Sequence, residues 1–160
     1  MTPPDTSLII TGAVAVLSLS AAGSALGTGV AASAAVGAWK KCFAQNKPAP
    51  MSLLGFVGAP ITQTLYGLIL MIAFLRILDK ALLPGAGLAI LLLGIFAGFA
   101  IGLSAWLQGR AAAGAADAQS ETGQGLANYF AALGVVEVVA IFTMVFTYLA
   151  IGNFVAGPAA

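Results

Sequence analysis

Hydrophobic residues along this chain gather into four long runs, which three short polar segments separate. The runs extend over about Leu8 to Ala38, Met51 to Leu75, Gly85 to Leu107 and Leu126 to Ile151. Each exceeds the roughly 20 residues that an α-helix needs to cross the hydrocarbon core of a bilayer. The pattern predicts an all-α integral membrane protein with four transmembrane helices, in a single membrane domain over residues 1–160.

The polar segments carry all six basic residues, and their distribution predicts the orientation. The first holds Lys40, Lys41 and Lys47, the second Arg76 and Lys80, and the third Arg110. Four spans put the first and third segments on one side of the membrane, with four Lys or Arg against two in the second segment. Because basic residues are enriched in cytoplasmic loops, we expect loops 39–50 and 110–124 to be cytoplasmic.

Composition agrees with a membrane protein and excludes several other classes. Hydrophobic residues make up 61% of the chain and charged residues 7%, against about 25% charged in soluble domains. A net charge of +1 argues against a nucleic-acid partner. The absence of His and a single Cys42 rule out an internal disulfide and a Cys/His metal cluster.

The chain also repeats itself at a shift of 75 residues. The shift superimposes Gly23, Ala25, Gly27, Ser33 and Thr62 on Gly98, Ala100, Gly102, Gln108 and Glu137. We therefore expect two tandem helical hairpins, 1–80 and 81–160, which share one membrane orientation because each has two spans. Inverted repeats, common in secondary transporters, need an odd number of spans per half. By this register Gln108 lies level with Ser33 of the first helix. At the position of Glu137 the first hairpin has Thr62, so only the second hairpin carries a carboxylate there.

Glycines recur in the first and third hydrophobic runs. The first contains G-S-A-L-G-T-G from Gly23 to Gly29, and the third has Gly94, Gly98 and Gly102 at intervals of four. Neither run matches a phosphate-binding loop pattern. Small residues at this spacing let helices approach closely in lipid. The pattern predicts that these two helices pack together with the other two outside them, a geometry suited to a ring of copies.

The fourth run contains one acid, Glu137, with no other charge between Glu121 and the C-terminus. It would lie near the middle of the bilayer, where an ionisable side chain costs on the order of 3 kcal/mol. Such a residue is expected to have a function.

Other polar residues inside the predicted spans fit the same site. Pro60 removes a backbone hydrogen bond in the second helix, and Thr62, Gln63 and Tyr66 follow it, while Gln108 lies near the end of the third helix. Hydroxyl, amide, carbonyl and carboxylate oxygens suit a small hard cation. One negative charge matches one monovalent ion. The oxygen set favours Na⁺, whereas H⁺ would need only the acid in an apolar pocket.

Two motifs around these residues resemble a known family. The segment A-P-I-T-Q-T-L-Y-G, from Ala59 to Gly67, is similar to L-P-G-T-Q-G-L-Y-G in sodium-translocating proteolipids of V-type (V/A-type) rotary ATPases. Gln108 in L-Q-G-R-A-A-A-G and the lone Glu137 match that family's helix-three glutamine and essential glutamate. The chain thus resembles the duplicated, four-helix rotor-ring subunit over nearly its whole length.

The resemblance implies a site and a set of partners. Na⁺ would be held by Glu137, Gln63, Gln108, Thr62 and the backbone carbonyl of Ala59, with Tyr66 and Pro60 in support. The subunit would be a non-catalytic part of a bacterial cell-membrane complex that hydrolyses ATP, and it would need no cofactor. Its partners would be identical copies in a ring, a stator membrane subunit with a basic residue, and lipids. A central-shaft subunit would contact the cytoplasmic loops, where Lys40, Lys41 and Lys47 are candidates.

Three alternatives remain at the level of sequence. The same rotor subunit could carry H⁺. A small secondary transporter could also use one acid, and it predicts aromatic side chains around a substrate pocket, whereas Trp39 and Trp106 lie toward helix ends. A purely structural four-helix membrane protein would have no use for Glu137.

Overall fold

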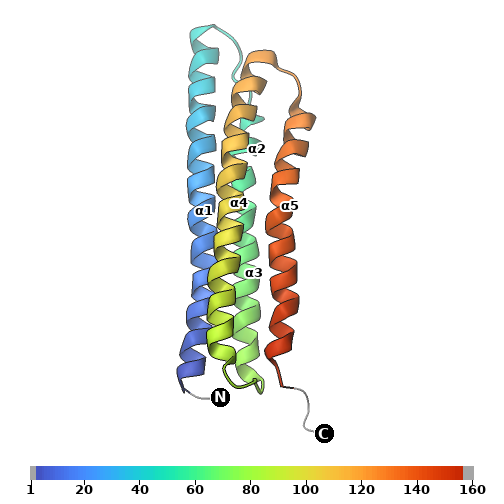
Figure 1. The fold of residues 1–160 in the computed structure, drawn as a ribbon. Coiled ribbons are helices and arrows are strands. Elements are labelled where there is room, and N and C mark those ends of the chain that lie inside the picture. Colours follow the sequence, from blue (N-terminus) through green and yellow to red (C-terminus); the bar gives the residue numbers. More distant parts are fainter. Residues whose placement is uncertain (1–2, 157–160) are drawn as a thin grey trace.

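The computed structural model describes residues 3–156, and these fold into a bundle of long helices (Figure 1). The helices are α1 (Pro3–Ala44), α2 (Leu53–Gly58), α3 (Thr62–Arg76), α4 (Ala86–Thr122) and α5 (Leu126–Ile151). Short 3₁₀ turns occupy Ala59–Ile61, Ile77–Asp79 and Gly152–Phe154. The all-α prediction is confirmed, and the bounds of α5 agree with the predicted fourth run.

Four segments of the described chain are long and apolar enough to cross a membrane. They are Asp5–Ala44, Leu53–Asp79, Ala86–Thr122 and Leu126–Phe154. The first and last described residues lie at the same end of the bundle (Figure 1), as four spans require. These properties indicate a membrane protein.

The connections at the opposite end of the bundle are shorter than the predicted loops 39–50 and 110–124. Helix α1 continues to Ala44 and α4 to Thr122, so the predicted loop 110–124 was too long: its residues up to Thr122 belong to the helix. Alanine has the highest helix propensity, and buried alanines of α4, including Ala112 and Ala116, pack with Ala31 and Ala35 of α1. This packing extends both helices beyond the length that a bilayer requires.

Glycines hold α1 and α4 together in a parallel pair. A Cβ on Gly12 would lie 2.8 Å from the carbonyl oxygen of Ile90, and one on Gly98 would lie 2.9 Å from the Cα of Val16. Gly23 lies in the same way against the backbone of Gly102. Backbones this close exclude any side chain at these positions. The predicted close packing of the two glycine-rich helices is confirmed.

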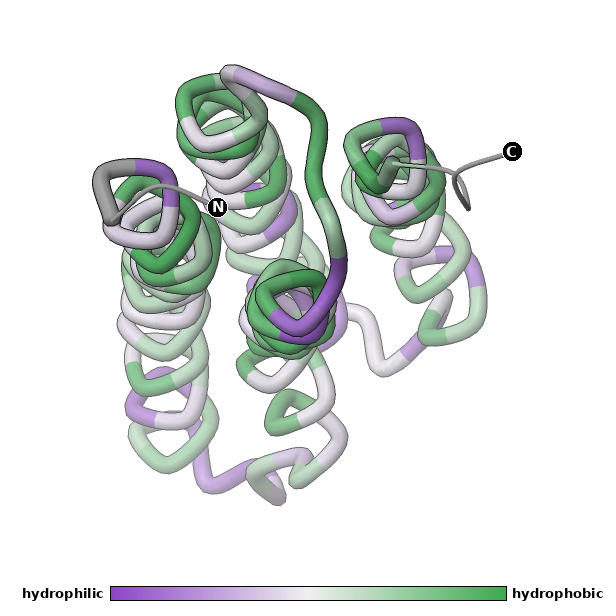
Figure 2. Tube along the Cα trace, turned by 90° about the horizontal axis from the view of Figure 1, so that it is seen from below, coloured by the Kyte–Doolittle hydropathy of each residue, from purple (hydrophilic) through white to green (hydrophobic). Residues whose placement is uncertain are grey.

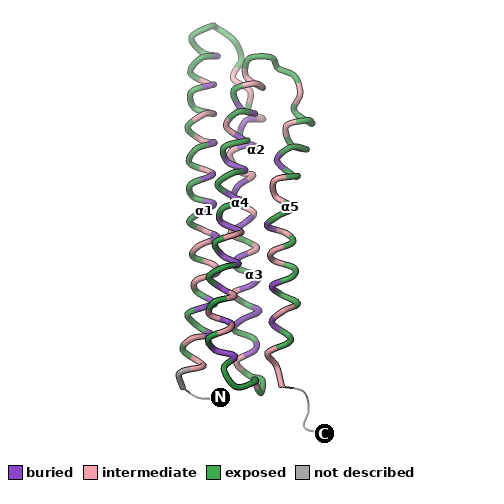
Figure 3. The backbone as a smooth tube through the Cα atoms, viewed as in Figure 1, coloured by how far each residue is buried: buried purple, intermediate pink, exposed green. Residues whose placement is uncertain are grey.

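The remaining helices pack around this pair. Seen from the end where the termini lie, α4 stands between α1 and α5, and α3 lies beside α1 and α4 (Figure 2). Much of α5 is exposed (Figure 3), including the apolar side chains of Val135, Val139, Phe142 and Phe146. In a membrane such a surface faces lipid or another copy of the chain rather than water.

The C-terminal segment ties α5 to the connection between α3 and α4. The N–H of Leu83 donates to the carbonyl oxygen of Phe154 at 3.0 Å, and the N–H of Ala156 donates to that of Ala81 at 2.8 Å. Between them Leu82 and Val155 form an isolated antiparallel bridge. These bonds fix the end of α5 opposite the start of α4.

Candidate ion site

Two fully buried glutamines join three helices near the middle of the bundle. Gln63 of α3 and Gln108 of α4 both have 0% of their surface exposed. The amide nitrogen of Gln63 donates to Oε1 of Gln108 at 2.8 Å. The amide nitrogen of Gln108 in turn donates to α5, to the carbonyl oxygen of Leu133 at 3.0 Å and to Oε2 of Glu137 at 3.2 Å. Buried amides need such partners, since an unpaired one costs several kcal/mol in an apolar environment.

Glu137 receives one hydrogen bond on each carboxylate oxygen. Besides the bond from Gln108, the hydroxyl of Tyr66 on α3 donates to Oε1 of Glu137 at 2.6 Å. This distance is within the range of charge-assisted O–H···O⁻ bonds. The two donors hold the carboxylate on the side of α5 that faces α3 and α4, although Glu137 itself is only partly buried.

Three further oxygen atoms gather on the α3 side of the glutamines. The hydroxyl of Thr62 donates to the carbonyl oxygen of Ala59 at 3.0 Å and lies 3.2 Å from Oε1 of Gln63. The backbone N–H of Thr62 also donates to Ala59. Hydroxyl, amide and carbonyl oxygens are thus adjacent to one another, next to the buried amides.

Pro60 explains the local backbone here. It lies in the first part of the 3₁₀ turn Ala59–Ile61, which separates α2 from α3 within one membrane-length segment. Proline has no N–H to donate and its ring clashes with the preceding helical turn, so the regular helix is interrupted. The carbonyl of Ala59 and the hydroxyl of Thr62 lie together at this interruption.

The structure therefore brings all seven predicted site residues into one region between α3, α4 and α5. Ser33, which the repeat placed level with Gln108, lies elsewhere. Its hydroxyl is exposed and donates to Gly29 at 2.8 Å within α1. Gly109, next to Gln108, instead lies against Gly27. The contact register of the parallel helices differs from the sequence repeat by more than one helical turn.

One residue of this region, Ser104, was not among the predicted site residues. It is 5% exposed, and its hydroxyl donates to the carbonyl oxygen of Val136 at 3.0 Å. Ser104 precedes Gln108 by four residues and so shares its helix face. This four-residue spacing is the sequence feature from which Ser104 could have been predicted to lie near the site. The bond fixes α4 to α5 directly beside Glu137.

Among residues 3–156 no three His, Cys, Asp or Glu side chains lie close enough to hold a metal ion together. A cation in this region would therefore meet one carboxylate and several neutral oxygens. This donor set suits a monovalent hard cation. A divalent ion would leave an uncompensated positive charge in an apolar environment.

The predicted shaft-binding lysines lie at the other end of the bundle from the termini. Lys41 of α1 forms an ion pair with Glu121 of α4, and both side chains are about half exposed. Lys40 and Lys47 are exposed. The ring nitrogen of Trp39 donates to the carbonyl oxygen of Pro50 at 2.9 Å, which ties the end of the connection between α1 and α2 to α1.

Comparison of the chain with protein-family models and with curated proteins gave no match.

Proposed function

We propose that this chain is an ion-carrying rotor-ring subunit of a V-type rotary ATPase, with one Na⁺ per copy at Glu137. The observation that supports this most is the hydrogen-bonded cluster across three helices. It joins a single carboxylate in the middle of a membrane-length helix to two fully buried glutamines. Oxygens of Thr62 and Ala59 lie at its edge.

Binding of Na⁺ would exchange hydrogen bonds for oxygen–cation contacts. The bond from Gln63 to Gln108 and the bond from Gln108 to Glu137 would open, and both amides would turn so that their oxygens face the ion. The hydroxyl of Thr62 would turn its proton away, which leaves its oxygen and the carbonyl of Ala59 free to coordinate.

Tyr66 and Ser104 would act as positioning residues. Tyr66 can donate to Glu137 with or without a bound cation, because it contacts the carboxylate oxygen that Gln108 does not use. Ser104 holds the backbone of α5 one residue before Glu137. Together they fix the direction of the carboxylate.

Rotation would couple to ion passage through the cost of an exposed charge. A bare carboxylate that faces lipid costs several kcal/mol, so Glu137 leaves the stator only when a cation neutralises it. At the stator a basic residue would compete for the carboxylate and release the ion. ATP hydrolysis in a separate soluble head would drive rotation through a central shaft. Lys40 and Lys47 are the candidates to contact that shaft, since Lys41 is engaged by Glu121.

One observation favours a second candidate, the same rotor subunit carrying H⁺. The hydroxyl of Tyr66 lies 2.6 Å from Oε1 of Glu137, and a hydroxyl can accept as well as donate. A protonated Glu137 could therefore donate to Tyr66 once that hydroxyl turned its own proton away.

Carbodiimide labelling of Glu137 separates the two. Carbodiimides react with the protonated acid, so a bound Na⁺ protects it. We expect NaCl to slow labelling at a fixed pH, with choline chloride at equal ionic strength as the control and Glu137→Gln as the unlabelled blank. Equal rates in both salts would instead assign the subunit to H⁺.

The size of the assembled protein tests the rotor itself. We expect the chain, solubilised in mild detergent, to migrate as a large homo-oligomer. A dimer would contradict the rotor proposal and favour a small secondary transporter.

A further inference from the structure

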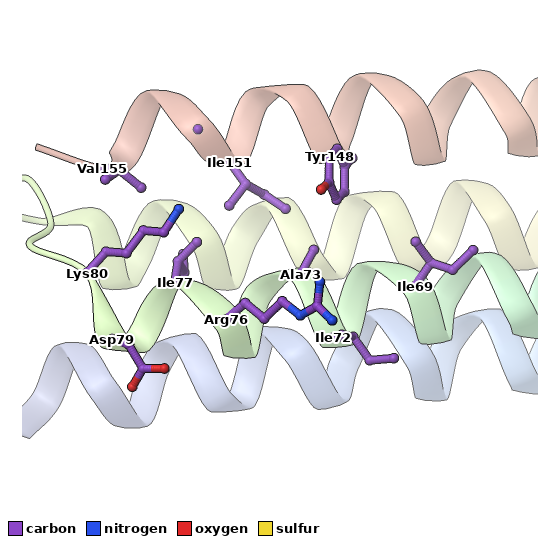
Figure 4. A pocket seen from close by; sticks show the side chains of 11 residues that line it. Ile69, Ile72, Ala73, Arg76, Ile77, Asp79, Lys80, Tyr148, Ile151 and Val155 are labelled. Carbon is purple, nitrogen blue, oxygen red and sulfur yellow. The ribbon is translucent and has the colours of Figure 1, made fainter. Parts of the chain in front are cut away.

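A groove between α3 and α5 lies away from the ion site, near the end of the bundle where the termini lie (Figure 4). Its volume is about 910 Å³, at the upper end of the range for small-molecule sites. Its walls are mostly apolar: Ile69, Ile72, Ala73, Ile77, Ile151 and Val155. Tyr148, which also lines it, lies roughly 16 Å along α5 from Glu137 at 1.5 Å per residue. The groove shares no residue with the polar cluster.

Two basic side chains border this groove. Arg76 ends α3, and Lys80 follows the 3₁₀ turn after it. Both line the cavity, as does Asp79. Figure 4 shows Lys80 extended toward α5 and Arg76 lying along α3, whereas the carboxylate of Asp79 points away from α5. Within residues 3–156 neither cation is part of an ion pair, since the salt bridge found there joins Lys41 and Glu121.

The basic and apolar side chains of the groove lie at the depths of a phospholipid's headgroup and acyl chains, respectively. The apolar segment of this span ends at Asp79, so Arg76 and Lys80 lie at the level of the headgroups while Ile69 and Ile72 lie within the hydrocarbon. An exposed apolar groove at this depth is filled by acyl chains, because water there has no polar partners. Guanidinium and ammonium groups above it attract phosphate, and the planar guanidinium can bind it with two parallel hydrogen bonds.

We propose that the groove between α3 and α5 binds one anionic phospholipid. Its phosphate would contact Arg76 and Lys80, and one acyl chain would lie along Ile69 and Ile72. Tyr148 would cover the chain from the α5 side. This binding requires a membrane-embedded bundle but does not depend on which ion Glu137 carries or on rotation.

A single tryptophan in the groove gives a direct measurement. Tyr148→Trp in a Trp39→Phe/Trp106→Phe background would be reconstituted into phosphatidylcholine vesicles. One series of vesicles would contain increasing fractions of phosphatidylglycerol brominated on its acyl chains. The other would contain increasing fractions of phosphatidylcholine brominated in the same way. We expect brominated phosphatidylglycerol to quench the fluorescence of the introduced indole at a much lower mole fraction. Each cation should increase the preference for phosphatidylglycerol over phosphatidylcholine about fivefold, because a basic residue near the surface contributes about 1 kcal/mol.

Matched variants locate the cause of this preference. Arg76→Gln/Lys80→Gln should reduce it by about 25-fold, the product of two fivefold effects. Lys40→Gln/Lys47→Gln removes the same charge at the opposite end of the bundle and should leave it unchanged. Carbodiimide labelling of Glu137 should be the same in all these variants. A negative result for lipid binding can therefore be distinguished from a negative result for the ion site.

Several outcomes would overturn the proposal. Equal quenching by the two brominated lipids would mean that the groove holds bulk lipid only. No quenching by either would mean that a second copy of the chain covers it. Loss of the preference in 10 mM inorganic phosphate would indicate a site for free anions. Native mass spectrometry of the unmodified protein from mixed vesicles provides a check without substitutions: we expect one retained phosphatidylglycerol per chain, and none retained would contradict the site.

Discussion

Gly109→Ala tests the close approach of α1 and α4 and its effect on the ion site. Gly109 lies next to Gln108 on the face of α4 that contacts α1. A Cβ added there would overlap the carbonyl oxygen, carbon and Cα of Gly27, whereas ordinary contacts of a Cβ lie at 3.4–4 Å. Because both partners are backbone, no side chain can turn away. The two helices must separate locally by about 1 Å.

The expected cost follows from that separation. A gap of about 1 Å forfeits up to about half of the dispersion energy of each contact that it opens, and forcing atoms into a packed interface costs about 1–3 kcal/mol. Gly23, Gly94 and Gly102 make similarly tight contacts along the same interface, which leaves the helices little room to adjust. We therefore expect a packing cost for Gly109→Ala near the upper limit, about 3 kcal/mol. Alanine regains up to about 1 kcal/mol through its helix propensity. The net loss should be about 2 kcal/mol.

The free energy of unfolding can be measured in mild detergent by titration with dodecyl sulfate, followed by circular dichroism. Gly114→Ala is the matched control, because it lies in the same helix and a Cβ there would meet nothing within 4 Å. We expect Gly114→Ala to be neutral or slightly stabilising and Gly109→Ala to be destabilised. Since α4 also carries Gln108, the carbodiimide reactivity of Glu137 should change in Gly109→Ala alone.

Equal stability of the two variants would refute the reasoning. It would mean that α1 and α4 do not approach each other through these glycines, and that the position of Gln108 does not depend on this contact.

Two further predictions concern the ion site. Glu137→Gln should abolish ion uptake by the complex in vesicles while the homo-oligomer still assembles. The control Glu121→Gln, at an exposed position, should transport normally. Ion uptake by Glu137→Gln would exclude the carboxylate as the ion carrier. Thr62→Val replaces a hydroxyl with a methyl group of similar size, so the NaCl concentration that gives half protection from carbodiimide should rise about tenfold, as expected for about 1.4 kcal/mol lost with one ligand. Thr143→Val, whose hydroxyl bonds only within α5 at 2.8 Å, should leave that concentration unchanged.

Other features of the molecule could not have been read from hydropathy. The extension of α4 to Thr122 depends on contacts of its alanines with α1, and the role of Ser104 depends on which way its face is turned. The repeat of 75 residues predicts that Ser33 lies at the same height in the bundle as Gln108. The glycine contacts instead place Gly27 beside Gly109, the residue next to Gln108. Register between helices follows from how two surfaces fit, and similarity between two halves of a sequence does not specify it.

The four apolar helices and the candidate chemistry of Glu137, Thr62, Gln63 and Gln108 follow from the amino-acid sequence alone. This is because the cost of placing polar groups in lipid is set residue by residue and can be summed along the chain. The contacts among those polar groups, the distance between α1 and α4, and the groove with two cations between α3 and α5 depend on how the helices pack. These outcomes depend on the volumes and hydrogen bonds of side chains from different helices, which meet only when the bundle has formed.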